Sequence, residues 1–149
     1  MSRSPLAPRV VTTSQAEVIC FMASRAMVRI NSEDTGGLFT VLELNEAPGA
    51  GVPPHVHHAE DEVFHIIEGR ASFYVDGKTI EVGPGTTLFG PRDVAHGYQV
   101  QGQETLKMLV TVYPAGIEKM FRELAALPPG PPDMKKIGDI CQRYHIDFV

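Results

Sequence analysis

Residues 49–69, GAGVPPHVHHAEDEVFHIIEG, constrain the fold of this chain more than any other stretch. His55 and His57 are two residues apart, so in an extended strand their side chains point to the same face. The residues 58–61 are predicted to form a turn, after which a second strand begins at Glu62. If Glu62 lies on the face that the two histidines share, one β-hairpin brings two imidazoles and a carboxylate together.

Imidazole and carboxylate groups that converge in this way suit a divalent first-row metal such as iron, manganese, cobalt, nickel, copper or zinc. A single histidine on a strand is more often a hydrogen-bonded structural residue than a ligand. The joint spacing of these three residues favours metal binding over that structural role.

Short apolar runs separated by Gly, Pro, Asn and Asp fill most of the remaining chain. The segment 71–82, ASFYVDGKTIEV, contains Asp76-Gly77, the strongest short-range sequence signal for a β-hairpin. Pro53 and Pro54 cannot donate ladder hydrogen bonds, so we expect them at the edge or first residue of the His55 strand. Further strands are expected at residues 18–22, 26–30, 38–44, 86–89 and 106–112, and from His96 onward. The pattern predicts an all-β sandwich or barrel.

The hydrophobic period changes toward the C-terminus. Apolar residues recur at helical spacing at Ile117, Met120, Phe121 and Leu124. This spacing predicts an amphipathic helix over residues 115–127 that packs on the outside of the β body. The sequence PPGPP at 128–132 ends that helix, and Asp133 caps a second one. The second helix is predicted to bury one stripe of residues, namely Ile137, Ile140, Cys141 and Tyr144.

Length and composition exclude several classes of partner. A chain of 149 residues is the usual size of one domain and long enough to bury a core. The net charge of −5, without a run of Lys or Arg, argues against nucleic acid as a partner. No apolar window approaches the length needed to span a bilayer, so we expect no membrane partner.

The N-terminal residues and the cysteines bear on the cellular compartment. The segment MSRSPLAPRV, residues 1–10, is expected to be a flexible or edge-pairing arm. It lacks the apolar core of a signal peptide, so we expect a cytoplasmic protein. Cys20 and Cys141 are far apart, and we expect two buried thiols rather than a disulfide.

The spacing of glycines, histidines and glutamate resembles the two signature motifs of the cupin superfamily. The first motif agrees with Gly49, the pair His55 and His57, Glu62 and Gly69. The gaps between them are five residues before His55, four before Glu62 and six before Gly69. Gly85, five residues, Pro91 and then His96 agree with the second. The resemblance implies that His96 is a fourth metal ligand. Asp93 replaces a usual glycine and Val100 a frequent asparagine, which concerns loop shape more than ligation.

The wider chain resembles the small single-domain cupins grouped with quercetin 2,3-dioxygenase, through EDTGGLFTVLEL, PPHVHHAEDEVFHIIEG and VYPAGIEKMFRELA. The resemblance implies an all-β double-stranded β-helix, a jelly-roll barrel, with two C-terminal α-helices. We expect one domain over residues 1–149, with the N-terminal arm at 1–10, the β-barrel at 11–113 and a helical tail at 114–149. One divalent transition metal (Fe, Mn, Ni, Co, Cu or Zn) would bind His55, His57, Glu62 and His96 and keep open coordination positions.

Glu60 competes with Glu62 as the carboxylate ligand but does not share the motif spacing. We therefore expect His58, Glu60 and Asp61 in a solvated polar turn. By strand parity His65 faces away from the metal, and His145 is expected on the surface near a helix C-terminus.

Residues on either side of His96 are candidates for the mouth of the site. Arg92, Asp93 and Tyr98 flank it, although Arg92 has an equally good interpretation as a surface charge. By strand alternation, Phe64, Ile66 and Tyr98 point to the same side as the metal ligands on their strands. They form either barrel core or an apolar pocket.

The resemblance favours a metal-dependent dioxygenase, an oxidoreductase acting on an enolic or aromatic hydroxylated small molecule such as a flavonol. Glu62 would act as the catalytic general base that takes the hydroxyl proton. Two alternatives stay open: a non-catalytic small-molecule binding cupin, and a metal-dependent isomerase or lyase. We also expect a homodimer, since small jelly rolls expose sheet edges, with the N-terminal arm as the exchanged strand.

Overall fold

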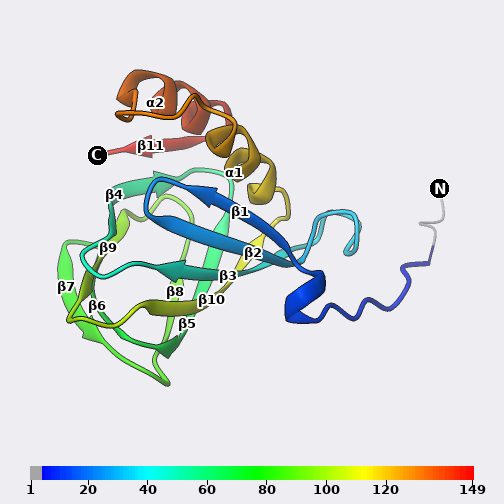
Figure 1. Cartoon of the computed structure of the whole chain (residues 1–149), viewed down its shortest axis with the longest axis horizontal. Coiled ribbons are helices and arrows are strands. Elements are labelled where there is room, and N and C mark those ends of the chain that lie inside the picture. The colour runs from blue at the N-terminus through cyan, green and yellow to red at the C-terminus, as the bar shows by residue number, and fades with distance from the viewer. Residues whose placement is uncertain (1–4) are drawn as a thin grey trace.

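The computed structural model describes residues 5–149 as two facing antiparallel β-sheets with two helices at one end (Figure 1). The six-stranded sheet contains, in order, β1 (Glu17–Phe21), β2 (Ser24–Ile30), β3 (Thr40–Glu46), β10 (Leu106–Tyr113), β5 (Asp61–Glu68) and β8 (Thr87–Gly90). The five-stranded sheet contains β11 (Ile146–Phe148), β4 (Gly51–His57), β9 (His96–Gln101), β6 (Arg70–Val75) and β7 (Lys78–Val82). The predicted β-barrel with two C-terminal helices is confirmed.

The core lies between the two sheets and follows the period-two alternation of the strands. In β3 and β10 every second residue is buried, which is the pattern of strands with one face toward a core. Completely buried side chains come from both sheets, among them Leu42, Met108 and Val110 on one side and Phe73 on the other. The Asp76-Gly77 hairpin is also confirmed, because both residues have the positive φ angles that its tight turn between β6 and β7 requires.

The prediction for Pro53 and Pro54 was wrong. Both lie inside β4, which pairs with β11 on one side and β9 on the other. The β4–β9 register shifts between Val52 and His55, so the two prolines occupy a bulge opposite Gly97. A bulge leaves backbone N–H groups out of the ladder, which is why a paired strand tolerates two prolines there.

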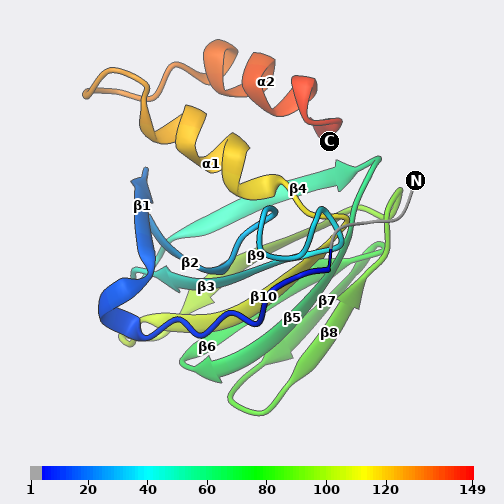
Figure 2. The same ribbon diagram turned by 90° about the vertical axis from the view of Figure 1, so that its right-hand side faces the viewer.

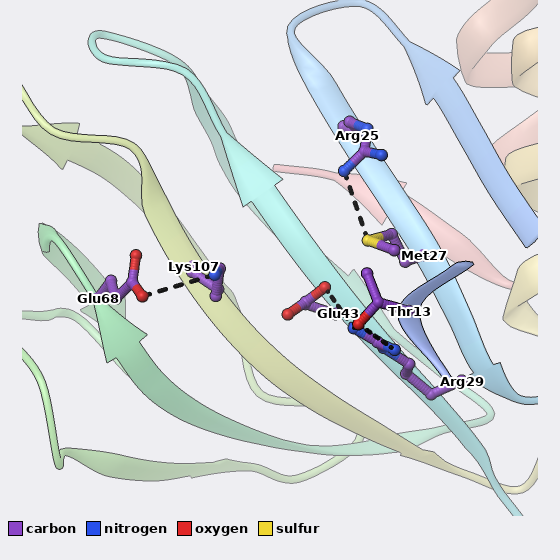
Figure 3. Close-up of polar contacts among 7 residues, drawn as sticks. All are labelled: Thr13, Arg25, Met27, Arg29, Glu43, Glu68 and Lys107. Atoms are coloured by element: carbon purple, nitrogen blue, oxygen red, sulfur yellow. Dashed lines mark hydrogen bonds and ion pairs between the residues drawn. The ribbon is translucent and has the colours of Figure 1, made fainter. Parts of the chain in front are cut away.

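Polar side chains stabilise the outer face of the six-stranded sheet (Figure 3). The Arg29 guanidinium lies 2.9 Å from the Glu43 carboxylate and also donates to Thr13 of the short 3-10 helix η1 (Thr13–Gln15). Residues 5–12 form no helix or strand and extend away from the sheets (Figure 1). The rest of the predicted arm, residues 1–4, lies outside the described residues.

Both predicted helices are present, as α1 (Ile117–Ala125) and α2 (Met134–Arg143), and lie next to each other at one end of the barrel (Figure 2). Asp133 caps α2 as predicted, since its carboxylate accepts a hydrogen bond from Lys136 N at 3.1 Å. The buried Glu118 carboxylate attaches α1 to the barrel by accepting from Ser32 N (2.7 Å) and Thr40 Oγ1 (2.8 Å). The helices therefore have a fixed position on the barrel.

Two details of the C-terminal half and the cysteines differ from expectation. The short strand β11 was not predicted, and it pairs with β4 so that Ile146 lies opposite His57 and Phe148 opposite His55. Cys141 is buried as predicted, but Cys20 is exposed on the edge strand β1. No helix in residues 5–149 has both the length and the apolar character that a transmembrane span requires.

Candidate metal centre and cavity

The four residues predicted to bind metal meet between the two sheets. His55 and His57 lie on β4, His96 begins β9, and Glu62 lies on β5 of the opposite sheet. One ligand atom from each of these buried residues falls within 4.8 Å of all the others. The structure corrects the expected hairpin, because residues 58–60 carry the chain from one sheet to the other. Glu62 therefore faces the histidines across the barrel.

The arrangement of these atoms fits a bound cation. Nε2 of His96 lies 2.7 Å and Nε2 of His57 lies 3.3 Å from Oε2 of Glu62. Glu62 Oε2 and His96 Nε2 are both buried without a hydrogen-bond partner. A buried polar atom without a partner is costly, and a metal ion between these atoms would satisfy them. The cluster can hold a divalent metal, whose identity the donor set leaves open.

Hydrogen bonds from the far side of two imidazoles fix their orientation. His55 donates through Nδ1 to the backbone carbonyl of Pro53 at 2.9 Å. His57 donates through Nδ1 to the carboxylate of Glu60 at 2.8 Å. Both bonds direct Nε2 of the ring at the centre, which is the usual arrangement of metal-binding histidines. The prediction that Glu60 lies in a solvated turn was wrong, because only 8% of it is exposed.

Burial and neighbouring charges shift the pKa values of the cluster residues in different directions. Burial lowers the pKa of His55 to about 4, so its imidazole is neutral at pH 7. Burial alone would raise the pKa of Glu62, but the neighbouring imidazoles of His96 and His57 lower it overall. Burial also opposes the charged form of His57, but its hydrogen bond to Glu60 and the charge of Glu62 raise its pKa. An ionised carboxylate thus lies beside at least one neutral imidazole.

A cavity of about 330 Å³ opens directly from the cluster. Its volume is within the range of small-molecule sites. Hydrophobic side chains of the barrel and of both helices form most of its wall, including Leu44, Phe64, Ile117, Met120, Phe121, Leu124, Met134 and Ile137. Much of the predicted helical stripe is core as expected, but it also forms one wall of this cavity.

The other residues singled out near the motifs divide between cavity and surface. Phe64 and Tyr98 line the cavity, whereas Ile66 is buried core. Arg92 is exposed and forms an ion pair with Asp61 at 3.0 Å, so it lies away from the cavity. Asp93 is exposed with a φ of 65°, in the left-handed region that favours glycine, the usual residue of the second cupin motif here.

The remaining histidines are exposed. His65 faces away from the metal cluster, as strand parity predicts, and hydrogen-bonds with Thr87. His145 is on the surface after α2, as predicted. His58 lies in the polar turn, where its ring contacts the carboxylates of Asp93 (2.8 Å) and Asp147 (3.2 Å). Both carboxylates raise the pKa of His58, mainly through the hydrogen bond with Asp93. These contacts connect the turn after β4 to β11.

Sequence reasoning missed one polar residue of the cavity, Glu46. It is only 1% exposed, and its carboxylate accepts a hydrogen bond from Ser24 Oγ at 2.6 Å. The strand alternation offered a signal, because Glu46 shares the inward parity of Leu42 and Leu44 on β3.

Comparison with known proteins agrees with this fold and site. The family model described as "Cupin domain" matches residues 43–112. Quercetin 2,3-dioxygenase of Bacillus subtilis is 30% identical over 92 residues, 62% of this chain and 27% of that protein. An oxalate-binding protein of Thermotoga maritima is 28% identical over 75 residues, 50% of this chain and 60% of that protein. This chain thus spans between 27% and 60% of the length of the curated relatives that it matches.

Solved structures resemble the fold at low sequence identity. KdgF from Halomonas sp. superposes with a TM-score of 0.67 at 13% identity, covering 76% of this chain and 99% of that one. An RmlC-like cupin from Shewanella frigidimarina gives a TM-score of 0.63 at 19% identity, covering 76% and 96%. The sheet topology, the matched domain and the motif residues lead to one conclusion: this chain contains a cupin domain.

Proposed function

We propose that His55, His57, Glu62 and His96 bind one divalent transition metal, and that the chain is a dioxygenase for an enolic or aromatic hydroxylated small molecule. One observation carries this proposal: four convergent donor atoms line a mostly apolar cavity. Four protein ligands leave coordination positions open, as in catalytic rather than structural metal sites.

The bound metal would supply a Lewis acid that stabilises the oxyanion of a deprotonated substrate hydroxyl. The ionised carboxylate of Glu62 lies at the centre of the cluster and accepts the hydroxyl proton as the general base. Glu60 holds the ring of His57 in place during this proton transfer. Side chains such as Phe64 and Met120 exclude water from the reacting end of the cavity.

Quercetin 2,3-dioxygenase of Bacillus subtilis supports the substrate class, because it aligns with 62% of this chain. A flavonol has the hydroxyl group and flat apolar body that the metal centre and the cavity wall would contact. Oxygen uptake is the direct test, using protein loaded with iron, manganese, cobalt or nickel and a panel of flavonols and enediols. We expect uptake that depends on metal and is lost in Glu62→Gln. No uptake with any pair of metal and substrate would refute the proposal.

A second candidate is a binding protein without turnover. The oxalate-binding protein of Thermotoga maritima, 28% identical over 75 residues, favours it. Ligand binding to the metal-loaded protein without oxygen uptake would support this candidate. Substrate conversion under anaerobic conditions would instead indicate an isomerase or lyase, since only an oxygenase requires oxygen.

We further propose that the chain functions in the cytoplasm as one domain and as a homodimer. The edge strands β1, β7 and β8 leave backbone groups available for pairing with a second copy. Sedimentation at micromolar concentration tests the dimer, and a monomer would refute it.

A further inference from the structure

The wall of the cavity contains a second polar group besides the metal cluster. Glu46 ends β3, and the carboxylate is buried among hydrophobic side chains that line the same cavity. Within residues 5–149 no Lys or Arg forms an ion pair with it. A buried carboxyl group in such surroundings is costly unless hydrogen bonds satisfy it.

Ser24 holds this carboxyl group in a defined orientation. It lies opposite Glu46 in the β2–β3 register and donates its hydroxyl to Oε2 at 2.6 Å. Tyr98 of β9 lines the same cavity, and its ring stacks on the fully buried Phe73. Burial raises the pKa of Glu46 more than hydrogen bonding lowers it.

Tyr98 also connects the Glu46 carboxyl group to the metal end of the cavity. It is two residues after His96 on β9 and therefore faces the same side of that strand. His96, Tyr98 and Glu46 all line the same cavity. A small molecule with one end at the metal cluster would thus extend along a wall that contains the Tyr98 phenol and the Glu46 carboxyl group.

We propose that Glu46, oriented by Ser24, is a specificity-determining residue that hydrogen-bonds a second hydroxyl group of the ligand. This inference rests on the proposed function, because the first hydroxyl group binds at the metal. It narrows the substrate class to compounds with at least two hydroxyl groups, separated by a flat apolar body. A hydroxyl group suits this role because it both donates and accepts, as a carboxyl group beside Ser24 requires.

Matched pairs of metal chelators test the inference without turnover. The protein is loaded with Zn²⁺, and binding is measured by absorbance under anaerobic conditions. Quercetin is compared with 3-hydroxyflavone, and kojic acid with allomaltol. Each pair shares one chelating hydroxyketone, and the first member has additional hydroxyl groups. The variants are Glu46→Leu, Glu46→Gln, which keeps a donor and an acceptor, and Glu104→Leu, a control on an exposed loop.

We expect the wild type to prefer the more hydroxylated member of at least one pair by about tenfold, the ratio expected for one well-placed hydrogen bond. Glu46→Leu should abolish that preference while changing the affinity for the less hydroxylated member less than about threefold. Glu46→Gln should keep most of the preference for the more hydroxylated member, and Glu104→Leu should keep all of it. Zinc content measured on every variant separates loss of the metal from loss of selectivity.

Two results would overturn the inference: no preference in the wild type, or an unchanged preference in Glu46→Leu with zinc bound. Wild-type protein that binds no zinc would refute the proposed function as well. Loss of preference in Glu46→Leu would support the role of Glu46 even if oxygen uptake were never observed.

Discussion

Replacing Glu60 should weaken metal binding although Glu60 is not a ligand. Its carboxylate accepts the Nδ1 proton of His57 at 2.8 Å, and both side chains are buried. Hydrogen bonds to charged groups contribute about 1.5–3 kcal/mol, and each 1.4 kcal/mol corresponds to a tenfold change in affinity. Glu60→Ala should therefore raise the dissociation constant for Zn²⁺ about 10- to 100-fold, the range found for such supporting residues.

Glu60→Gln is a milder substitution at the same position. Its amide oxygen still accepts from His57 but has no charge, so we expect a loss of only about three- to tenfold. Competition with a chromophoric chelator at neutral pH measures the zinc affinity, and thermal unfolding of the metal-free variants shows whether they are folded.

Asp61→Asn is the matched control, because Asp61 is the next carboxylate along the chain, at the first residue of β5, but pairs with Arg92 on the surface. It should change zinc affinity less than about twofold. If Glu60→Ala bound zinc as tightly as Asp61→Asn and the wild type, Glu60 would not position His57 and the reasoning would be refuted.

Three further perturbations test other parts of the structure. Met120→Trp should fill the cavity from α1 and weaken quercetin binding more than about tenfold. Elemental analysis should show an unchanged zinc content. An unchanged affinity for quercetin would mean that the ligand binds elsewhere. Gly97→Ala should destabilise the protein by about 1–3 kcal/mol in urea unfolding, because a Cβ atom there would lie 2.6 Å from Val52 O at the β4 bulge. Glu118→Gln should lower stability at pH 7 but much less in acid. Burial opposes ionisation of Glu118, but hydrogen bonds from Ser32 and Thr40 lower its folded-state pKa below the ordinary 4.5. The contribution of its charge is therefore present above about pH 4.5 and lost as the pH falls through the folded-state pKa. Unfolding curves of the wild type and Glu118→Gln that stay equally far apart from pH 7 to pH 3 would contradict this assignment.

Strand alternation and motif spacing predicted much of the metal cluster, because both depend on local geometry. The period of two placed His55 and His57 on one face, and the cupin motifs supplied His96 from a distant strand. The same local rules could not distinguish a hairpin from a crossing between sheets. A short polar connection after His57 is compatible with either, and only the packing of the two sheets selects the crossing.

Polarity was a poor guide to burial near the centre. Glu60 was assigned to a solvated turn because its neighbours are polar, but its partner His57 draws it into the interior. Glu46 was missed because the predicted strand ended at Leu44, which placed Glu46 in the following loop, whereas β3 continues to Glu46. The strand β11 escaped prediction because three residues are too short to show a period, and its pairing with β4 is a long-range contact.

The cavity wall is assembled from two segments that are separate in the sequence. Residues 55–96 contain the whole metal cluster, whereas the apolar side of the cavity comes in large part from α1 and α2. The metal cluster and much of the apolar wall are therefore encoded in different stretches of the chain. Exchanging the helical segment between related chains would give hybrids with the same cluster and a differently shaped wall. The apolar side of the cavity can then change without the cluster, whereas the carboxyl group of Glu46 stays with the barrel.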